Sequence, residues 1–62
     1  MRDPYYLFYK RAMELVDTYR ERGLCEDATY QEVFAKLKQE YPMVEDTRLD
    51  TEIRFYMDKR LG

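Results

Sequence analysis

Histidine and tryptophan are missing from this chain, and cysteine occurs once, at Cys25. Histidine is the side chain that most often performs general acid–base catalysis near neutral pH, so the usual base for activating a hydroxyl nucleophile is missing. The four threonines therefore lack a histidine partner, and 62 residues leave little room for a concave active site. The sequence predicts a protein that is not an enzyme, uses no cofactor and has no small-molecule substrate.

Ligands for a metal ion are equally scarce. One cysteine without histidine cannot supply the spaced ligand set of a structural zinc site. The acidic pairs Glu26-Asp27 and Glu45-Asp46 lack the alternating oxygen ligands of a calcium-binding loop. We therefore predict no metal site, and we interpret Cys25 as an inert thiol in a loop.

Long apolar runs are also missing, because charged residues interrupt every apolar stretch well before the roughly 20 residues that cross a bilayer. Residues 1–4 show neither the basic start nor the apolar run of a secretory signal. A single cysteine fits a reducing compartment. These features predict a cytoplasmic protein without a membrane partner.

The net charge is −2, and we expect the surplus acid to lie in connections, at Glu26, Asp27, Glu45 and Asp46. The rest of the chain is then nearly neutral. No segment forms the basic stripe that is typical of a phosphate-binding face.

What the chain does contain is the apolar periodicity of helices, first over residues 4–22. Asp3 is a candidate N-cap, Pro4 suits the first helical position, and Gly23 suits the left-handed residue that ends a helix. One side of this helix collects the apolar residues Tyr5, Phe8, Ala12, Leu15, Val16 and Tyr19.

A second helix is predicted over residues 29–41. Thr29 and Glu32 match the capping box, in which two side chains satisfy free backbone N–H groups at a helix start. Pro42 disfavours helical geometry at Tyr41, so the helix should end near Glu40. Its buried stripe is Tyr30, Val33, Phe34, Leu37 and Tyr41.

A third helix is predicted over residues 47–60, with Asp46 or Thr47 as its cap. Its buried stripe is Leu49, Ile53, Tyr56 and Met57. No segment shows the alternation of a strand. The prediction is an all-α fold, a small three-helix domain that occupies residues 1–62.

Aromatic side chains are abundant, with seven tyrosines and three phenylalanines. Most tyrosines fit the margin of a core, where the ring is buried and the hydroxyl stays in water. Others lie off the buried stripes, among basic residues, which is the composition of a protein interface. The predicted partner-binding residues are Phe55, Arg48, Lys59, Leu7, Tyr6 and Tyr9.

These residues predict a small cytosolic helical module for protein–protein interaction, such as a regulator, an adaptor or an accessory subunit. Its partner is another protein or a second copy of itself, because a domain of this size gains stability by burying more surface. A homodimer is the favoured form.

An alternative is a helix-turn-helix DNA-binding regulator with residues 47–60 as its recognition helix. Arg48, Thr51, Arg54, Phe55 and Lys59 would then face nucleic acid. The connection 41–46 is longer than the usual turn, and Asp50, Glu52 and Asp58 would approach the phosphates. These features lower the weight of this alternative without excluding it.

Overall fold

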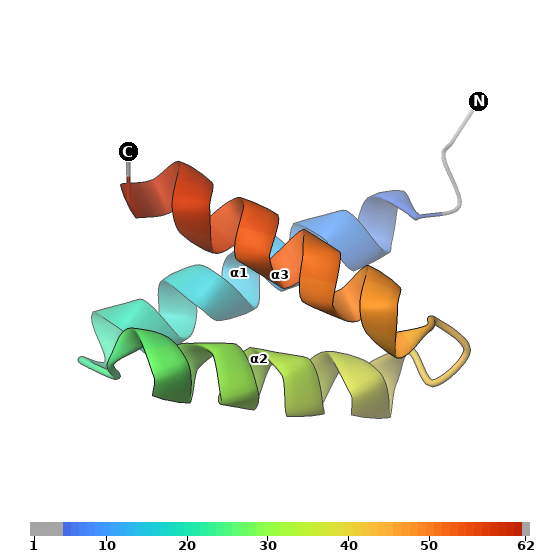
Figure 1. The fold of residues 1–62 in the computed structure, drawn as a ribbon, viewed down its shortest axis with the longest axis horizontal. Coiled ribbons are helices and arrows are strands. Elements are labelled where there is room, and N and C mark those ends of the chain that lie inside the picture. The colour runs from blue at the N-terminus through green and yellow to red at the C-terminus, as the bar shows by residue number, and fades with distance from the viewer. Residues whose placement is uncertain (1–4, 62) are drawn as a thin grey trace.

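The computed structural model describes the backbone of residues 5–61 and the side chains of residues 5–58. Over this range the chain forms three α-helices and no strand: α1 (Tyr6–Glu21), α2 (Glu26–Glu40) and α3 (Asp46–Leu61). The chain runs one way in α1, back in α2 and forward again in α3, and each helix contacts both others (Figure 1). The predicted all-α, three-helix fold is confirmed.

Gly23 ends α1 as predicted. Its φ of 88° is in the left-handed region, where a side chain would be strained. The Gly23 amide donates to the Arg20 carbonyl at 2.9 Å, and the Leu24 amide donates to the Tyr19 carbonyl at 3.3 Å. This pair of bonds is the Schellman motif, which satisfies carbonyl groups that the helix leaves free. At the other end, the predicted cap Asp3 lies outside the described residues.

The predicted start of α2 is wrong by three residues. The helix begins at Glu26 after Cys25, and Thr29 is completely buried inside it. The capping box at Thr29 and Glu32 therefore does not form. Glu26 and Asp27, which we expected in a connection, instead occupy the first turn, where negative charge favours the positive end of the helix dipole.

The connection from α2 to α3 covers residues 41–45 and is fixed at both ends. The Tyr41 amide donates to the Leu37 carbonyl at 2.7 Å, and the helix stops at Glu40, as Pro42 predicts. Val44 is buried against the core although it belongs to no helix. Lys38 Nζ lies 2.5 Å from Asp46 Oδ1, so an ion pair joins the end of α2 to the start of α3.

The three helices share one apolar core. Its members are Phe8, Ala12, Leu15, Val16, Val33, Leu37, Val44, Leu49, Ile53 and Met57. With the exception of Val44, these residues come from the predicted stripes. Tyr5 differs from its prediction because 41% of it remains exposed near the start of α1. None of the described helices combines the length and apolar content needed to cross a membrane.

Candidate interaction surfaces

Tyrosine and arginine side chains join α1 to α3. Arg48 on α3 donates from Nη2 to the Tyr9 hydroxyl of α1 at 2.5 Å. The Arg48 guanidinium carbon also lies 4.9 Å from the ring centre of Tyr5, and the rings of Tyr5 and Tyr9 stack with centres 6.2 Å apart. A guanidinium in this position is attracted by the ring faces. Arg48 is thus held by Tyr9 of α1 and by Tyr5, the residue that precedes α1.

The same surface continues along α3. Glu52 lies one turn beyond Arg48, and its Oε2 is 3.3 Å from Arg48 Nε. Burial raises the pKa of the Tyr56 hydroxyl, and the nearby Glu52 carboxylate raises it further. The ring of Phe55 meets the ring of Tyr56 edge-on, with centres 5.4 Å apart. We call the group Tyr5, Tyr9, Arg48, Glu52, Phe55 and Tyr56 the aromatic face.

Phe55 is the most exposed of its described aromatic members, with 56% of its surface accessible. An exposed phenylalanine that adjoins tyrosine and arginine has the composition of an interface centre. Tyr9 is only half-buried and packs against the core, so part of its surface serves the fold.

The predicted partner-binding residues do not all come together. Phe55, Arg48 and Tyr9 belong to the aromatic face. Leu7 is 66% exposed. It lies two residues before Tyr9 on the helix, so the two side chains point about 160° apart. Tyr6 is 55% exposed and lies between these two directions. The side chain of Lys59 lies outside the described residues.

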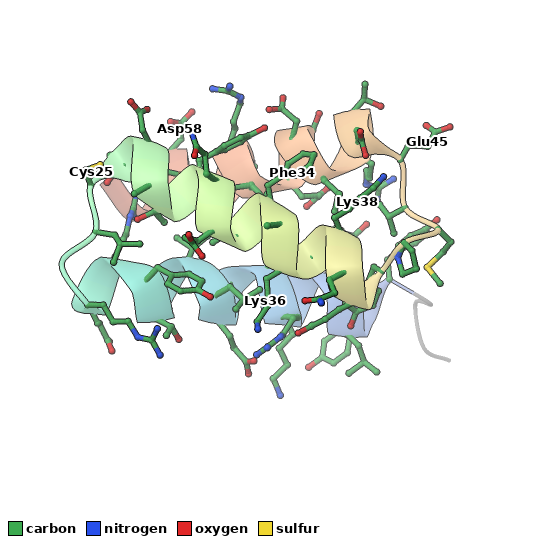
Figure 2. All side chains as sticks on the ribbon, turned by 90° about the horizontal axis from the view of Figure 1, so that it is seen from below. Cys25, Phe34, Lys36, Lys38, Glu45 and Asp58 are labelled. Atoms are coloured by element: carbon green, nitrogen blue, oxygen red, sulfur yellow. The ribbon has the colours of Figure 1, made fainter. Side chains whose placement is uncertain are left out.

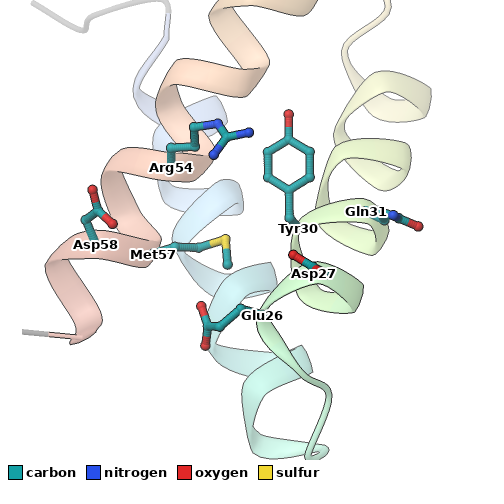
Figure 3. A pocket seen from close by; sticks show the side chains of 7 residues that line it. All are labelled: Glu26, Asp27, Tyr30, Gln31, Arg54, Met57 and Asp58. Carbon is teal, nitrogen blue, oxygen red and sulfur yellow. The ribbon is translucent and has the colours of Figure 1, made fainter.

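A groove of about 380 Å³ runs between α2 and α3 (Figure 3). The sequence did not predict it, because it depends on how two helices lie against each other. Met57 and Tyr30 form its apolar wall, with Glu26 and Asp27 toward one end and Arg54 at the other (Figure 3). Asp58 also lines the groove, from α3.

Arg54 is bound in place at its end of the groove. Its Nε donates to Asp50 Oδ1 at 2.9 Å, and its guanidinium carbon lies 5.0 Å from the ring centre of Tyr30. The Tyr30 hydroxyl donates to the same Asp50 oxygen. Hydrogen bonds from Tyr30 and Arg54 lower the pKa of Asp50, whereas burial and the bond to Asp50 raise the pKa of Tyr30.

Arg20 of α1 binds two of the residues that line the groove. Its Nη2 donates to Glu26 Oε1 at 2.7 Å and to the Met57 carbonyl at 3.0 Å. One side chain of α1 therefore holds the start of α2 and the last turns of α3. The Arg20 side chain is only 18% exposed, because its aliphatic stem lies along the edge of the core.

Within residues 5–58 no group of three or more cysteine, aspartate or glutamate side chains is arranged to hold a metal ion. No protein-family model matches the chain, and comparisons with curated proteins and with solved structures found no match. Its function is therefore inferred from the geometry of its surfaces.

Proposed function

We propose that this chain is a small cytosolic helical module that acts by binding another protein chain and not by catalysis, with a second copy of itself as the first partner. The observation that carries the proposal is the exposed ring of Phe55 within the aromatic face. Burying a phenylalanine side chain stabilises a complex by about 1.5–3 kcal/mol. A ring of this kind at the centre of a contact can dominate its binding energy.

The charges of the aromatic face favour self-association. Arg48 and Glu52 carry opposite charges one turn apart on the same helix. In a two-fold dimer the same patch meets itself, so a patch of one sign would repel its copy. The balanced pair avoids this repulsion and lets Phe55 of each copy approach the other.

DNA binding through α3 has less support. Arg48 lies 3.3 Å from Glu52, and Arg54 lies 2.9 Å from Asp50, so each arginine is already paired with a carboxylate. Much of the affinity for DNA comes from the neutralisation of phosphates by basic side chains. Either these ion pairs would have to break, or their carboxylates would repel the phosphates.

Phe55→Ala tests the proposal. We expect the variant to fold like the parent chain, because the ring is largely exposed, and to associate roughly tenfold more weakly. Size-exclusion chromatography with light scattering over a concentration series measures the association. Leu7→Ala is the matched control, since Leu7 is also apolar and largely exposed but points away from Tyr9.

Three outcomes would contradict this function. The parent chain could remain a monomer at high concentration, or Leu7→Ala could weaken association as much as Phe55→Ala. The chain could also bind duplex DNA with an affinity that falls steeply with salt, which is the behaviour of a DNA-binding protein.

A further inference from the structure

Four residues outside the core line up along α3. Arg48, Thr51, Phe55 and Asp58 follow one another at intervals of three and four residues, so they share one face of the helix. Thr51, Phe55 and Asp58 are exposed, and 40% of the Arg48 side chain is accessible. We call these four residues the α3 seam. Their spacing is that of the contact positions in a pair of packed helices.

The first half of the α3 seam is hollow, and the second half projects. A shallow depression of about 450 Å³ adjoins the start of α3 and is lined by Glu45, Thr47, Arg48, Thr51 and Glu52. Thr51 has a short side chain, whereas the Phe55 ring, one turn further along, is 56% exposed. In packed helices a projecting side chain of one helix inserts between four residues of the other. The α3 seam carries both parts, the projecting ring of Phe55 and the depression around Thr51.

We propose that the α3 seams of two copies pack antiparallel, with Phe55 of each copy in the depression around Thr51 of the other. This inference rests on the proposed self-association and adds its orientation and register. In a two-fold dimer the same surface meets itself, so both rings are seated at once. Each ring then leaves water, which favours the complex.

The charges of the α3 seam select the antiparallel orientation. Arg48 lies seven residues before Phe55, and Asp58 lies seven residues after Thr51. When Phe55 faces Thr51 of the second copy, Arg48 therefore faces Asp58 of the second copy, and the reverse contact forms as well. A parallel pair would instead place each of these charges beside its own equivalent, and like charges that meet at an interface cost affinity.

Both charged groups can make these contacts. Asp58 is exposed and has no ion-pair partner among the described side chains. It lies near one end of α3, whereas Glu45 marks the other end, so an antiparallel partner brings its Asp58 to the end where Arg48 lies (Figure 2). Arg48 is held in place by Tyr9 and Glu52, and a guanidinium has five N–H donors. An ordered cation thus meets an exposed carboxylate at each end of the proposed contact.

Asp58→Lys tests the register. It replaces attraction by repulsion at two places in the dimer, so we expect the dissociation constant to rise about tenfold. Glu32→Lys is the matched control, because it makes the same change in charge at an exposed site on α2, and it should raise the constant less than twofold. Sedimentation equilibrium measures both constants, and circular dichroism compares the folds.

A pair of charge-swapped chains extends the test. Arg48→Glu and Asp58→Lys should each self-associate weakly, whereas their equimolar mixture should form a heterodimer about as tight as the parent dimer. In that heterodimer both contacts between positions 48 and 58 again join opposite charges. Native mass spectrometry distinguishes the three dimers by mass. The comparison of Asp58→Lys with Glu32→Lys stands alone if Arg48→Glu fails to fold.

The possible failures are distinguishable. A parent chain that remains a monomer would overturn the proposed function and this register together. A parent dimer that Asp58→Lys and Glu32→Lys weaken equally would overturn the register alone, as would a mixture of folded charge-swapped chains that forms no heterodimer.

Discussion

Arg20 is a single side chain that holds all three helices together at one end of the domain. Its guanidinium binds Glu26 and the Met57 carbonyl while its stem remains largely buried. Arg20→Met keeps the apolar stem and removes the donors, so we expect a loss of about 1 kcal/mol in the free energy of unfolding. Urea denaturation measures it.

Arg22→Met is the control for this prediction. Arg22 is exposed and lies over the Tyr19 ring at 5.4 Å, without a buried hydrogen bond among the described contacts. Its substitution should cost less than about 0.5 kcal/mol. If both variants lose the same free energy of unfolding, the hydrogen bonds by which Arg20 links the helices contribute nothing to stability.

Thr29 gives a prediction whose sign separates two interpretations. Its side chain is fully buried, and its hydroxyl has no hydrogen-bond partner among the described residues. Valine has the same shape and nearly the same helix propensity, so Thr29→Val removes an unsatisfied polar group and should stabilise the domain by about 1 kcal/mol. Thermal denaturation reports the change, with Thr18→Val on the exposed side of α1 as a near-neutral control.

A helix cap at Thr29 would behave in the opposite way. Loss of a threonine cap costs about 1 kcal/mol. A destabilised Thr29→Val variant would therefore support the capping-box interpretation and contradict the burial of Thr29 within α2.

At the level of the elements, the end of α1 depends on Gly23. A Cβ atom there would meet nothing within 4 Å, so the cost of a side chain comes from the backbone alone. Gly23→Ala should destabilise the domain by about 1 kcal/mol, because alanine is strained at a φ of 88°. Gly23→Asn should lose less, since asparagine tolerates this conformation. Equal losses in a denaturation series would show that φ is not the cause.

The two helix ends at Gly23 and Glu40 were predictable because a glycine and a proline determine them within a few residues. The start of α2 was not, since Thr29-x-x-Glu32 satisfies the same local pattern wherever the helix begins. The burial of Thr29 determines where α2 begins. Thr29 shares the buried side of α2 with Val33 and Leu37, and the helix extends back to place Glu26 beside Arg20.

The candidate surfaces were predictable only in part. The exposure of Phe55 follows from its position away from Leu49 and Ile53 on one helix, which the sequence gives directly. The bond between Tyr9 and Arg48 requires α1 to cross α3, and the groove requires α2 and α3 to lie side by side. Such relations between helices depend on packing that periodicity does not encode.

For the whole molecule, acid should weaken the fold. Tyr30 and Arg54 lower the pKa of Asp50, and Arg11 lowers the pKa of Glu40 through two hydrogen bonds of 2.9 Å. Because the folded chain then binds these protons less tightly than the unfolded chain does, stability falls as the pH drops below about 4. Tyr30 acts at the other extreme, since its raised pKa makes folding lose stability as the pH rises past about 10.

Asp50→Asn tests the predicted loss of stability in acid. The variant should be less stable than the parent at neutral pH and should lose less stability between about pH 5 and pH 3, because one linked carboxylate is gone. Urea denaturation at several pH values gives both quantities. Parallel curves for parent and variant would show that the pKa of Asp50 is not shifted by folding.

The contact between Tyr9 and Arg48 has a consequence for the order of folding. It joins residues 39 apart in the chain, whereas short connections make α1 with α2, and α2 with α3, local hairpins. Local contacts close small loops and form first, while distant contacts form after a greater loss of chain entropy. We therefore expect the aromatic face to assemble last, so that only a completely folded chain presents it to a partner.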